Sequence, residues 1–136
     1  MKQIYQLSPA QMEQLQGLYQ KEWWSTGRTL EETRSVVKHS QIVIGLEDID
    51  GQLNGFARVL TDYIFKALIF DLIVSEENRK KGLGEKLMRA ILDHPDLQKV
   101  KHFELYCLPE MIPFYEKFLF TTDTGKIRLM RYVTRS

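Results

Sequence analysis

Cysteine is almost absent from this sequence, where Cys107 is the single one among 136 residues. That scarcity excludes an intramolecular disulfide and a metal site built from several cysteines. The three histidines, His39, His94 and His102, are scattered without the spacing of metal ligands. We therefore expect no metal, and we interpret Cys107 as an inert packing residue of an apolar strand.

Excess charge and long apolar runs are lacking as well. Nineteen basic side chains against eighteen acidic ones give a formal net charge of +1, which predicts no binding surface for nucleic acid or an anionic membrane. The longest apolar runs, Ala67–Phe70 and Leu72–Val74, are interrupted by Asp71 and are too short to cross a bilayer. Residues 1–7 lack the apolar stretch of a secretory signal. We expect a cytoplasmic protein that does not associate with membranes.

What is present fits one globular domain. The sequence is 43% hydrophobic and 27% charged, which is enough apolar material for a core. Its length is that of a common domain, and no linker or repeat divides it. The prediction is a single domain over residues 1–136.

The patterning predicts alternating strands and helices. Ser8-Pro9 and Thr29 are typical helix starts, and Asp48–Gly51 is typical of a turn between two strands. The predicted helices follow Ser8 and Thr29 and cover 84–92 and 110–118; the predicted strands cover 2–7, 41–46, 52–61, 67–74, 102–107, 121–123 and 126–133. This order predicts an α/β fold with a mixed sheet and helices on its faces. The last two strands form an expected hairpin whose pairing between subunits would make a homodimer.

The strongest local signal is the segment 74–84, where an apolar strand leads through a glycine-containing turn into a helix. Backbone N–H groups and the dipole of a helix N-terminus favour anions. Gly82 and Gly84 let the backbone approach a phosphate, and Arg79, Lys80 and Lys81 add positive charge. Without an anion these cations would oppose the dipole, so we favour a phosphate site over an ordinary solvated turn.

The segment matches neither a P-loop nor a dinucleotide fingerprint, because no GxxxxGK[ST] occurs and Leu87 replaces the third glycine of GxGxxG. Instead, Arg79-x-x-Gly82-x-Gly84 resembles the [QR]-x-x-G-x-[GA] motif of the GCN5-related N-acetyltransferase (GNAT) superfamily. Residues 114–120, FYEKFLF, are similar to its "FYEKxGF" segment, and 107–115 to arylalkylamine N-acetyltransferases in particular. The two motifs stand in the family's order, and the resemblance covers most of the chain.

The resemblance implies the GNAT-like acyl-CoA N-acyltransferase fold, with a mostly antiparallel central sheet, splayed middle strands and helices on both faces. It implies acetyl-CoA as cofactor: loop amides hold the pyrophosphate, and free backbone groups of the preceding strand bind the pantetheine arm. The residues so implied are Leu72, Ile73, Val74, Arg79, Lys80, Lys81, Gly82, Leu83 and Gly84.

The sequence departs from the family at a few positions. Lys80 stands where the family has glycine and Glu76 where it has proline; neither family residue supplies a required N–H, so we expect pyrophosphate binding to survive. Leu119 replaces the glycine at the exit of the last helix, which is expected to change its C-cap.

Two residues are candidates for the chemistry. The resemblance implies that Tyr115 protonates the thiolate leaving group as a general acid; the alternative is packing of an amphipathic helix. Asp71 is a lone carboxylate in an apolar strand and needs partners there. It is a candidate base for the amine proton, or else an aspartate bonded to Arg58 or to backbone amides.

The acceptor side is predicted at Trp23, Trp24, Arg58 and Asp62. The two tryptophans would stack on an amine or form a core plug, and Asp62 would pair with an ammonium or with Arg58. The leading hypothesis is N-acetylation of a small primary amine by direct attack on acetyl-CoA. Acetylation of a protein lysine or N-terminus, and a non-catalytic acyl-CoA-binding module, remain as alternatives.

Overall fold

The computed structural model describes residues 1–134. Its contacts divide the chain into two compact units, Met1–Tyr106 and the part from Cys107 onward. The first unit contains a five-stranded sheet and the helices that cover it. The single domain expected over residues 1–136 stays a prediction.

The sheet of the first unit has the strand order β1-β2-β3-β4-β5. Its first four strands are antiparallel, and β5 runs parallel to β4. This is the mixed, mostly antiparallel sheet that the sequence predicted. The strands are β1 (Lys2–Ile4), β2 (Ile42–Glu47), β3 (Leu53–Thr61), β4 (Lys66–Val74) and β5 (His102–Leu105).

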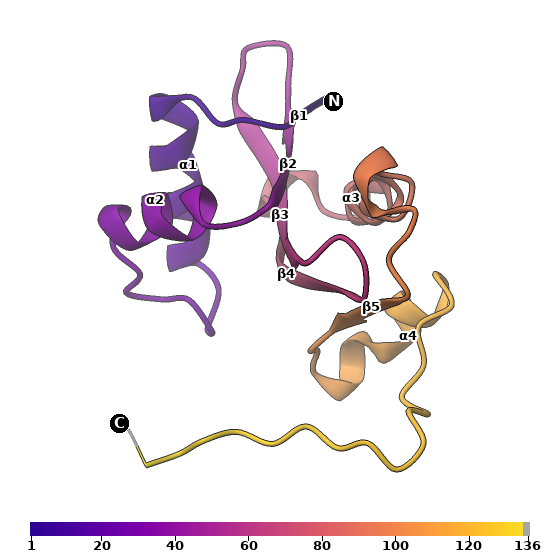
Figure 1. Cartoon of the computed structure of the whole chain (residues 1–136). Coiled ribbons are helices and arrows are strands. Elements are labelled where there is room, and N and C mark those ends of the chain that lie inside the picture. The colour runs from indigo at the N-terminus through magenta and orange to yellow at the C-terminus, as the bar shows by residue number, and fades with distance from the viewer. Residues whose placement is uncertain (135–136) are drawn as a thin grey trace. The chain divides into compact units, whose positions relative to one another are not determined.

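Helices cover both faces of this sheet (Figure 1): α1 (Pro9–Gln20) and α2 (Leu30–Lys38) lie on one side, and α3 (Leu83–Leu92) lies on the other. Ser8 and Thr29 are the N-caps of α1 and α2, and each forms a complete capping box. The reciprocal hydrogen bonds of a capping box satisfy two of the first amides of a helix. Both predicted helix starts are confirmed.

The core lies between the helices and the middle strands. On the α1 side, Leu15 and Tyr19 pack with Leu53, Phe56 and Ile73 in one buried cluster. α3 contributes further buried side chains, Leu83, Leu87, Met88 and Ile91. Burying a large apolar side chain stabilises the fold by about 1.5–3 kcal/mol, so these contacts hold α1 and α3 to the sheet.

Two expectations for the strands need correction. The near-continuous apolar run 67–74 is typical of a strand that is covered on both faces. Side chains of β4 instead alternate between buried and partly exposed, because successive residues point to opposite faces and one face is only partly covered. The strand predicted at 102–107 ends at Leu105, which leaves Cys107 exposed rather than packed in a strand.

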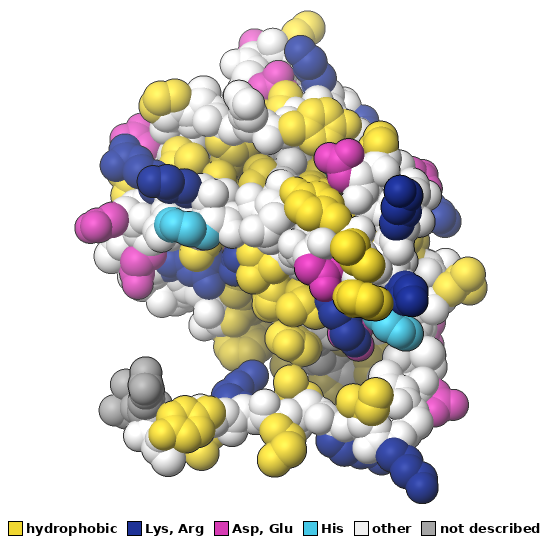
Figure 2. Space-filling view, in the orientation of Figure 1, with side chains coloured by type: hydrophobic (Ala, Val, Ile, Leu, Met, Phe, Trp, Pro, Cys, Tyr) yellow, Lys and Arg dark blue, Asp and Glu magenta, His cyan; other side chains and the backbone are white. Residues whose placement is uncertain are grey.

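The second unit has less regular structure than the sequence predicted. A short 3₁₀ helix (Pro109–Met111) leads into α4 (Ile112–Glu116), within the helix expected at 110–118. Residues 119–134 contain no strand, so the predicted terminal hairpin is wrong for this structure. A lone two-stranded hairpin is marginal in water, and this segment is largely exposed (Figure 2), including its apolar side chains Ile127, Leu129, Met130, Tyr132 and Val133.

Within residues 1–134, every helix is too short or too polar to span a bilayer.

Candidate functional site

β4 separates from β5 and bulges halfway along its length. The parallel pairing joins Lys66–Ile69 to His102–Leu105 and stops there. Just beyond, the register with β3 shifts between Phe56 and Arg58, and Asp71 adopts a positive φ of 57°. Bulges of this kind redirect a side chain and bend the strand. One edge of β4 is therefore unpaired from Phe70 to Val74, among the described residues, as the predicted splay requires.

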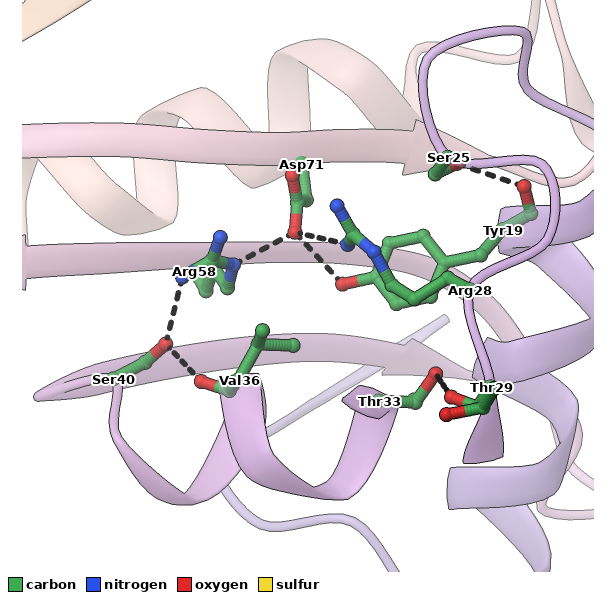
Figure 3. Close-up of polar contacts among 9 residues, drawn as sticks. All are labelled: Tyr19, Ser25, Arg28, Thr29, Thr33, Val36, Ser40, Arg58 and Asp71. Carbon is green, nitrogen blue, oxygen red and sulfur yellow. Dashed lines mark hydrogen bonds and ion pairs between the residues drawn. The ribbon is translucent and has the colours of Figure 1, made fainter. Parts of the chain in front are cut away.

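The Asp71 carboxylate at this bulge collects three hydrogen bonds (Figure 3). Its Oδ2 accepts from Arg58 Nε at 2.7 Å, from Tyr19 Oη at 2.8 Å and from Arg28 Nη1 at 3.1 Å. The Asp71 side chain is 7% exposed. A carboxylate this deeply buried needs opposite charge nearby, and the two guanidinium groups supply it.

Tyr19 and Arg28 belong to the cluster, and neither was predicted from the sequence as a partner of Asp71. Burial raises the pKa of the Tyr19 phenol, and the Asp71 charge raises it further, so the phenol stays protonated and donates to Asp71. The Arg28 guanidinium carbon lies 4.2 Å from the centre of the Tyr19 ring. This cation–π contact orients the guanidinium group. One indication of such partners was present in the sequence: a carboxylate in an apolar strand needs hydrogen-bond donors.

The loop between α1 and α2 brings Arg28 to this place. The buried Ser25 donates from Oγ to the Tyr19 carbonyl oxygen at 2.7 Å (Figure 3). Gln20 Nε2 donates to the Arg28 carbonyl oxygen at 2.7 Å. These bonds fix the middle of the loop and the end of the loop to the last turn of α1. Thr29 then starts α2 directly after Arg28.

The cluster bears on the role predicted for Asp71. The predicted alternative was that Asp71 binds Arg58. This ion pair is present, and Arg28 forms a second ion pair with Asp71. The Asp71 charge is shared by two guanidinium groups, and this arrangement favours a structural and positioning role. A role as general base stays a prediction.

The loop after β4 has the conformation of an anion site. Gly82 is the N-cap of α3 in the left-handed conformation, with φ 78° and ψ 12°. A Cβ at Gly82 would meet no atom within 4 Å, so a ligand can approach the backbone there. Lys86 makes the first intrahelical bond, N–H to the Gly82 carbonyl oxygen at 3.0 Å, and the amides of residues 83–85 precede it. These features fit a diphosphate.

Two of the basic side chains of the loop, Arg79 and Lys81, already form contacts within the protein. Arg79 Nη2 lies 2.9 Å from Glu22 Oε1, and Arg79 Nε donates to the Val74 carbonyl oxygen at 3.2 Å. Lys81 Nζ donates to Asn78 Oδ1 at 3.4 Å. The Arg79 side chain is half exposed, so its ion pair is weak and can exchange for a phosphate.

Lys80 is one of the departures from the family pattern, and its backbone conformation is unusual for a lysine. Its φ is 64°, a left-handed conformation that glycine adopts without strain and lysine adopts at a cost. Lys80 therefore has a backbone conformation that suits the glycine of the family pattern.

The predicted acceptor residues do not all come together. The side chain of Trp23 is 71% exposed and that of Trp24 is 38% exposed, so the core plug is wrong for Trp23. Trp24 meets the Tyr19 ring edge to face, with centroids 6.1 Å apart, and it lies 5.8 Å from the Arg28 guanidinium. Trp24 therefore borders the Asp71 cluster.

Asp62 has a local role. Its Oδ1 accepts from the backbone amides of Ile64, Phe65 and Lys66 at 2.9, 2.7 and 3.1 Å. These bonds, the one from Ile64 first, lower the pKa of the Asp62 carboxyl. The alternative Arg58–Asp62 pair is wrong, because Arg58 binds Asp71. Contact of Asp62 with an ammonium stays a prediction.

In the second unit, Tyr115 lies on α4. Burial, and to a smaller extent Cys107, raises the pKa of its phenol to about 12. Its ring meets those of Phe114 and Phe120 edge to face, with centroids 5.0 and 6.3 Å apart. A phenol with this pKa is protonated at neutral pH and able to donate. The pKa of the Cys107 thiol is also raised, by partial burial and then by Glu110, which makes it a poor nucleophile.

Leu119 ends the helical segment in the conformation of a glycine. Its φ is 70°, and the Phe120 amide donates to the Tyr115 carbonyl oxygen at 3.3 Å. This bond is the long-range bond of a glycine-type C-cap. The expectation that Leu119 would change the C-cap is therefore wrong; the leucine adopts, under strain, the left-handed conformation that a glycine adopts freely.

Comparison with known proteins identifies the family. The model of the acetyltransferase (GNAT) family matches residues 2–120, and the chain belongs to that family. The predicted resemblance and fold class are thereby confirmed. Members of this family use acetyl-CoA, and the left-handed Gly82 with open space above it fits that cofactor.

Several relatives and solved structures are similar to the chain. An uncharacterized N-acetyltransferase of Porphyra purpurea is 30% identical over 111 residues, which cover 79% of this chain and 64% of that protein. Serotonin N-acetyltransferase 2, chloroplastic, of Oryza sativa is 30% identical over 109 residues, covering 77% and 54%. The chain thus spans about half to two thirds of these relatives.

The fold recurs in solved structures. A GNAT-family protein of Xanthomonas campestris is 27% identical with a TM-score of 0.79, covering 98% of this chain and 94% of that one. An aminoglycoside 6'-N-acetyltransferase complexed with coenzyme A has a TM-score of 0.67 at 19% identity, covering 77% and 61%, and shares the fold.

Proposed function

We propose that this domain transfers the acetyl group of acetyl-CoA to a primary amine, by direct attack of the amine. A small-molecule amine is favoured as the acceptor. The observation that carries the proposal is the unpaired edge of β4 leading into the left-handed turn at Gly82. An extended chain can add to such an edge while its phosphates meet the helix amides.

In this proposal the residues of the chain have separate tasks. The amides of residues 83–85 and the side chains of Arg79, Lys80 and Lys81 hold the diphosphate. Main-chain groups of Leu72, Ile73 and Val74 orient the arm. The cofactor supplies an acetyl group activated as a thioester. Tyr115, whose pKa is raised to about 12 so that the phenol is protonated at neutral pH, gives a proton or a hydrogen bond to the departing sulfur.

Direct attack is supported by the state of the single cysteine. An acyl-enzyme route would need a reactive thiolate, and such thiolates have lowered pKa values. The pKa of Cys107 is raised instead. The acetyl group therefore passes directly to the amine, with no covalent acyl-enzyme intermediate at Cys107.

Two measurements test the proposed function. Calorimetry with acetyl-CoA gives the affinity, and thiol release with a panel of primary amines gives the turnover. We expect binding with one site and thiol release that depends on the amine. Binding without amine-dependent release would leave a cofactor-binding module, and absence of binding would refute the proposal.

Location and self-association are separate proposals. We propose a cytoplasmic location, with which a single cysteine that has no partner for an intramolecular disulfide is compatible; fractionation of cells that carry the tagged protein tests it. A homodimer was suggested by strands that residues 119–134 do not form. The exposed apolar side chains of that segment still support association, and sedimentation tests it.

A further inference from the structure

The buried cluster around Asp71 carries more positive than negative charge. Two guanidinium groups, Arg28 and Arg58, face one carboxylate, and Tyr19 is kept neutral by its raised pKa. Glu32 also interacts with Arg28, but it is fully exposed and binds the Thr29 amide. Water screens an exposed charge of this kind. The cluster therefore keeps an excess of one positive charge.

Several N–H donors of the two guanidinium groups form no hydrogen bond within residues 1–134. Arg28 uses Nη1 on Asp71. Arg58 uses Nε on Asp71 and Nη1 on Ser40 Oγ, the latter at 3.4 Å. Within residues 1–134, Arg28 Nε and Nη2 and Arg58 Nη2 have no partner, yet none of them is sealed from solvent. The side chains of Arg28 and Arg58 are 22% and 12% exposed, so a small ligand can reach these nitrogens.

Aromatic rings hold both guanidinium groups. Arg28 lies over the Tyr19 ring, and Arg58 lies over the Phe70 ring with its central carbon 5.0 Å from the ring centre. Contacts through the flat face leave the N–H edges for hydrogen bonds. Such edges match the two oxygens of a carboxylate or phosphate. The arrangement is that of an anion site with preorganised donors.

The cluster also lies at a meaningful place on the sheet. Asp71 is the bulged residue of β4, two residues after the last pairing with β5 at Ile69. In the proposed function the activated acetyl group is delivered along this same unpaired edge. An anion held by Arg28 and Arg58 would therefore belong to the molecule that meets the acetyl group.

We propose that Arg28 and Arg58 bind an anionic group of the acceptor, so that the substrate is a small primary amine that also carries a carboxylate or a phosphate. This inference rests on the proposed function. The excess positive charge repels an ammonium that brings no anion and attracts an amine that brings one. Trp24, next to Arg28, is an indole contact for the rest of the acceptor.

Matched pairs of amines test the proposal. Lysine is compared with cadaverine, and phosphoethanolamine with ethanolamine, by thiol release from acetyl-CoA. We expect kcat/KM to be at least ~10-fold higher for an anionic member, since one hydrogen bond to a charged group is worth about that factor. The two pairs distinguish a carboxylate from a phosphate. Equal rates, or higher rates for both members without an anion, overturn the proposal.

Variants show whether Arg28 is responsible. Arg28→Gln should remove the preference within the pair while leaving acetyl-CoA affinity unchanged, and Arg28→Lys should retain part of it. Arg34→Gln, an exposed arginine on α2, should leave the preference intact. If Arg28→Gln weakens acetyl-CoA binding and spares the preference, the anion belongs to the cofactor and the proposal is wrong. Thermal unfolding of each variant checks that it is folded.

A second readout is independent of turnover. Trp24 lies beside Arg28, so tryptophan fluorescence should change on titration with the preferred anionic amine, and Arg28→Gln should abolish that change. If no amine is turned over but this titration responds, the transferase function fails and the anion site stands. If turnover occurs with no preference and no response, the anion site fails and the transferase stands.

Discussion

Arg58 donates from Nε to Oδ2 of Asp71 at 2.7 Å, from β3 to the bulge of β4 beside it. The two residues do not face each other in a regular ladder; the register shift and the positive φ of Asp71 bring them together. The residue that the sequence suggested as a base is thus the centre of an ion-pair cluster. Its replacement separates the two roles.

Asp71→Asn keeps the shape of the side chain and tolerates a positive φ, but it removes the charge that both guanidinium groups share. We expect the free energy of unfolding to fall by about 1–3 kcal/mol, measured by urea denaturation. Asp50→Asn, on the exposed β2–β3 turn, should change little. An unchanged stability in Asp71→Asn would contradict a structural role for the cluster.

The same variant decides the catalytic role. Loss of a general base lowers kcat by about 10²–10⁴-fold, and the loss shrinks as rising pH deprotonates the free amine. A positioning role predicts a smaller loss that does not depend on pH in this way. The pH profile of Asp71→Asn against the parent protein therefore separates the two.

Tyr115→Phe removes the phenolic hydroxyl from α4 and leaves the ring. We expect kcat to fall at least ~10-fold, as for other general acids, with acetyl-CoA affinity unchanged by calorimetry. Tyr132→Phe, where the side chain is 74% exposed, serves as the control and should behave as the parent. A rate equal to that of the parent would remove Tyr115 from the mechanism.

The elements could be predicted from the sequence where the signal is local. The capping residues Ser8 and Thr29, the turn at Asp48–Gly51 and the glycine loop at Gly82 are set by short-range chemistry, and all four appear as expected. The terminal hairpin was wrong because a strand pattern at 126–133 says nothing of whether a partner strand is available.

The Asp71 cluster lay beyond sequence reasoning for a different reason. Tyr19 has the helical spacing of a core residue, and it does pack in the core, but its hydroxyl reaches a carboxylate 52 positions away. Arg28 lies in a loop whose path depends on Ser25 and Gln20. Long-range hydrogen bonds of this kind carry no periodic signal along the chain. The need of Asp71 for a partner was predictable, whereas two of its three partners were not.

Gly82→Glu places a carboxylate where the diphosphate is proposed to bind. We expect acetyl-CoA binding to be lost in calorimetry, because like charge and bulk both oppose the ligand. Gly51→Glu is a matched control: Gly51 and Gly82 have φ of 80° and 78°, and a Cβ meets nothing within 4 Å at either. The backbone strain is therefore similar in the two variants. Normal affinity in Gly82→Glu would place the cofactor elsewhere.

Tyr19 predicts a dependence of stability on alkaline pH. Its pKa is raised above the ordinary value of 10.0, so above that pH the unfolded chain loses a proton that the folded chain keeps. The contribution of Tyr19 to the free energy of unfolding is fully present below about pH 10. It falls as pH rises further, by up to ~1.4 kcal/mol per pH unit. Tyr19→Phe lacks this decline, so the gap to the parent should narrow between pH 9 and 11. Urea denaturation checks this, with Tyr132→Phe as the control; a constant gap would contradict it.

Leu119→Gly tests the strain at the exit of α4. Leu119 has a φ of 70° and a side chain that is 92% exposed, so the leucine bears a conformational cost and makes few contacts in return. Glycine adopts this conformation freely, and we expect the free energy of unfolding to rise by about 1 kcal/mol. Leu119→Ala retains the Cβ and therefore the strain, so it should gain nothing. If both variants change stability equally, the effect comes from the lost side chain, and the left-handed C-cap is not a source of strain.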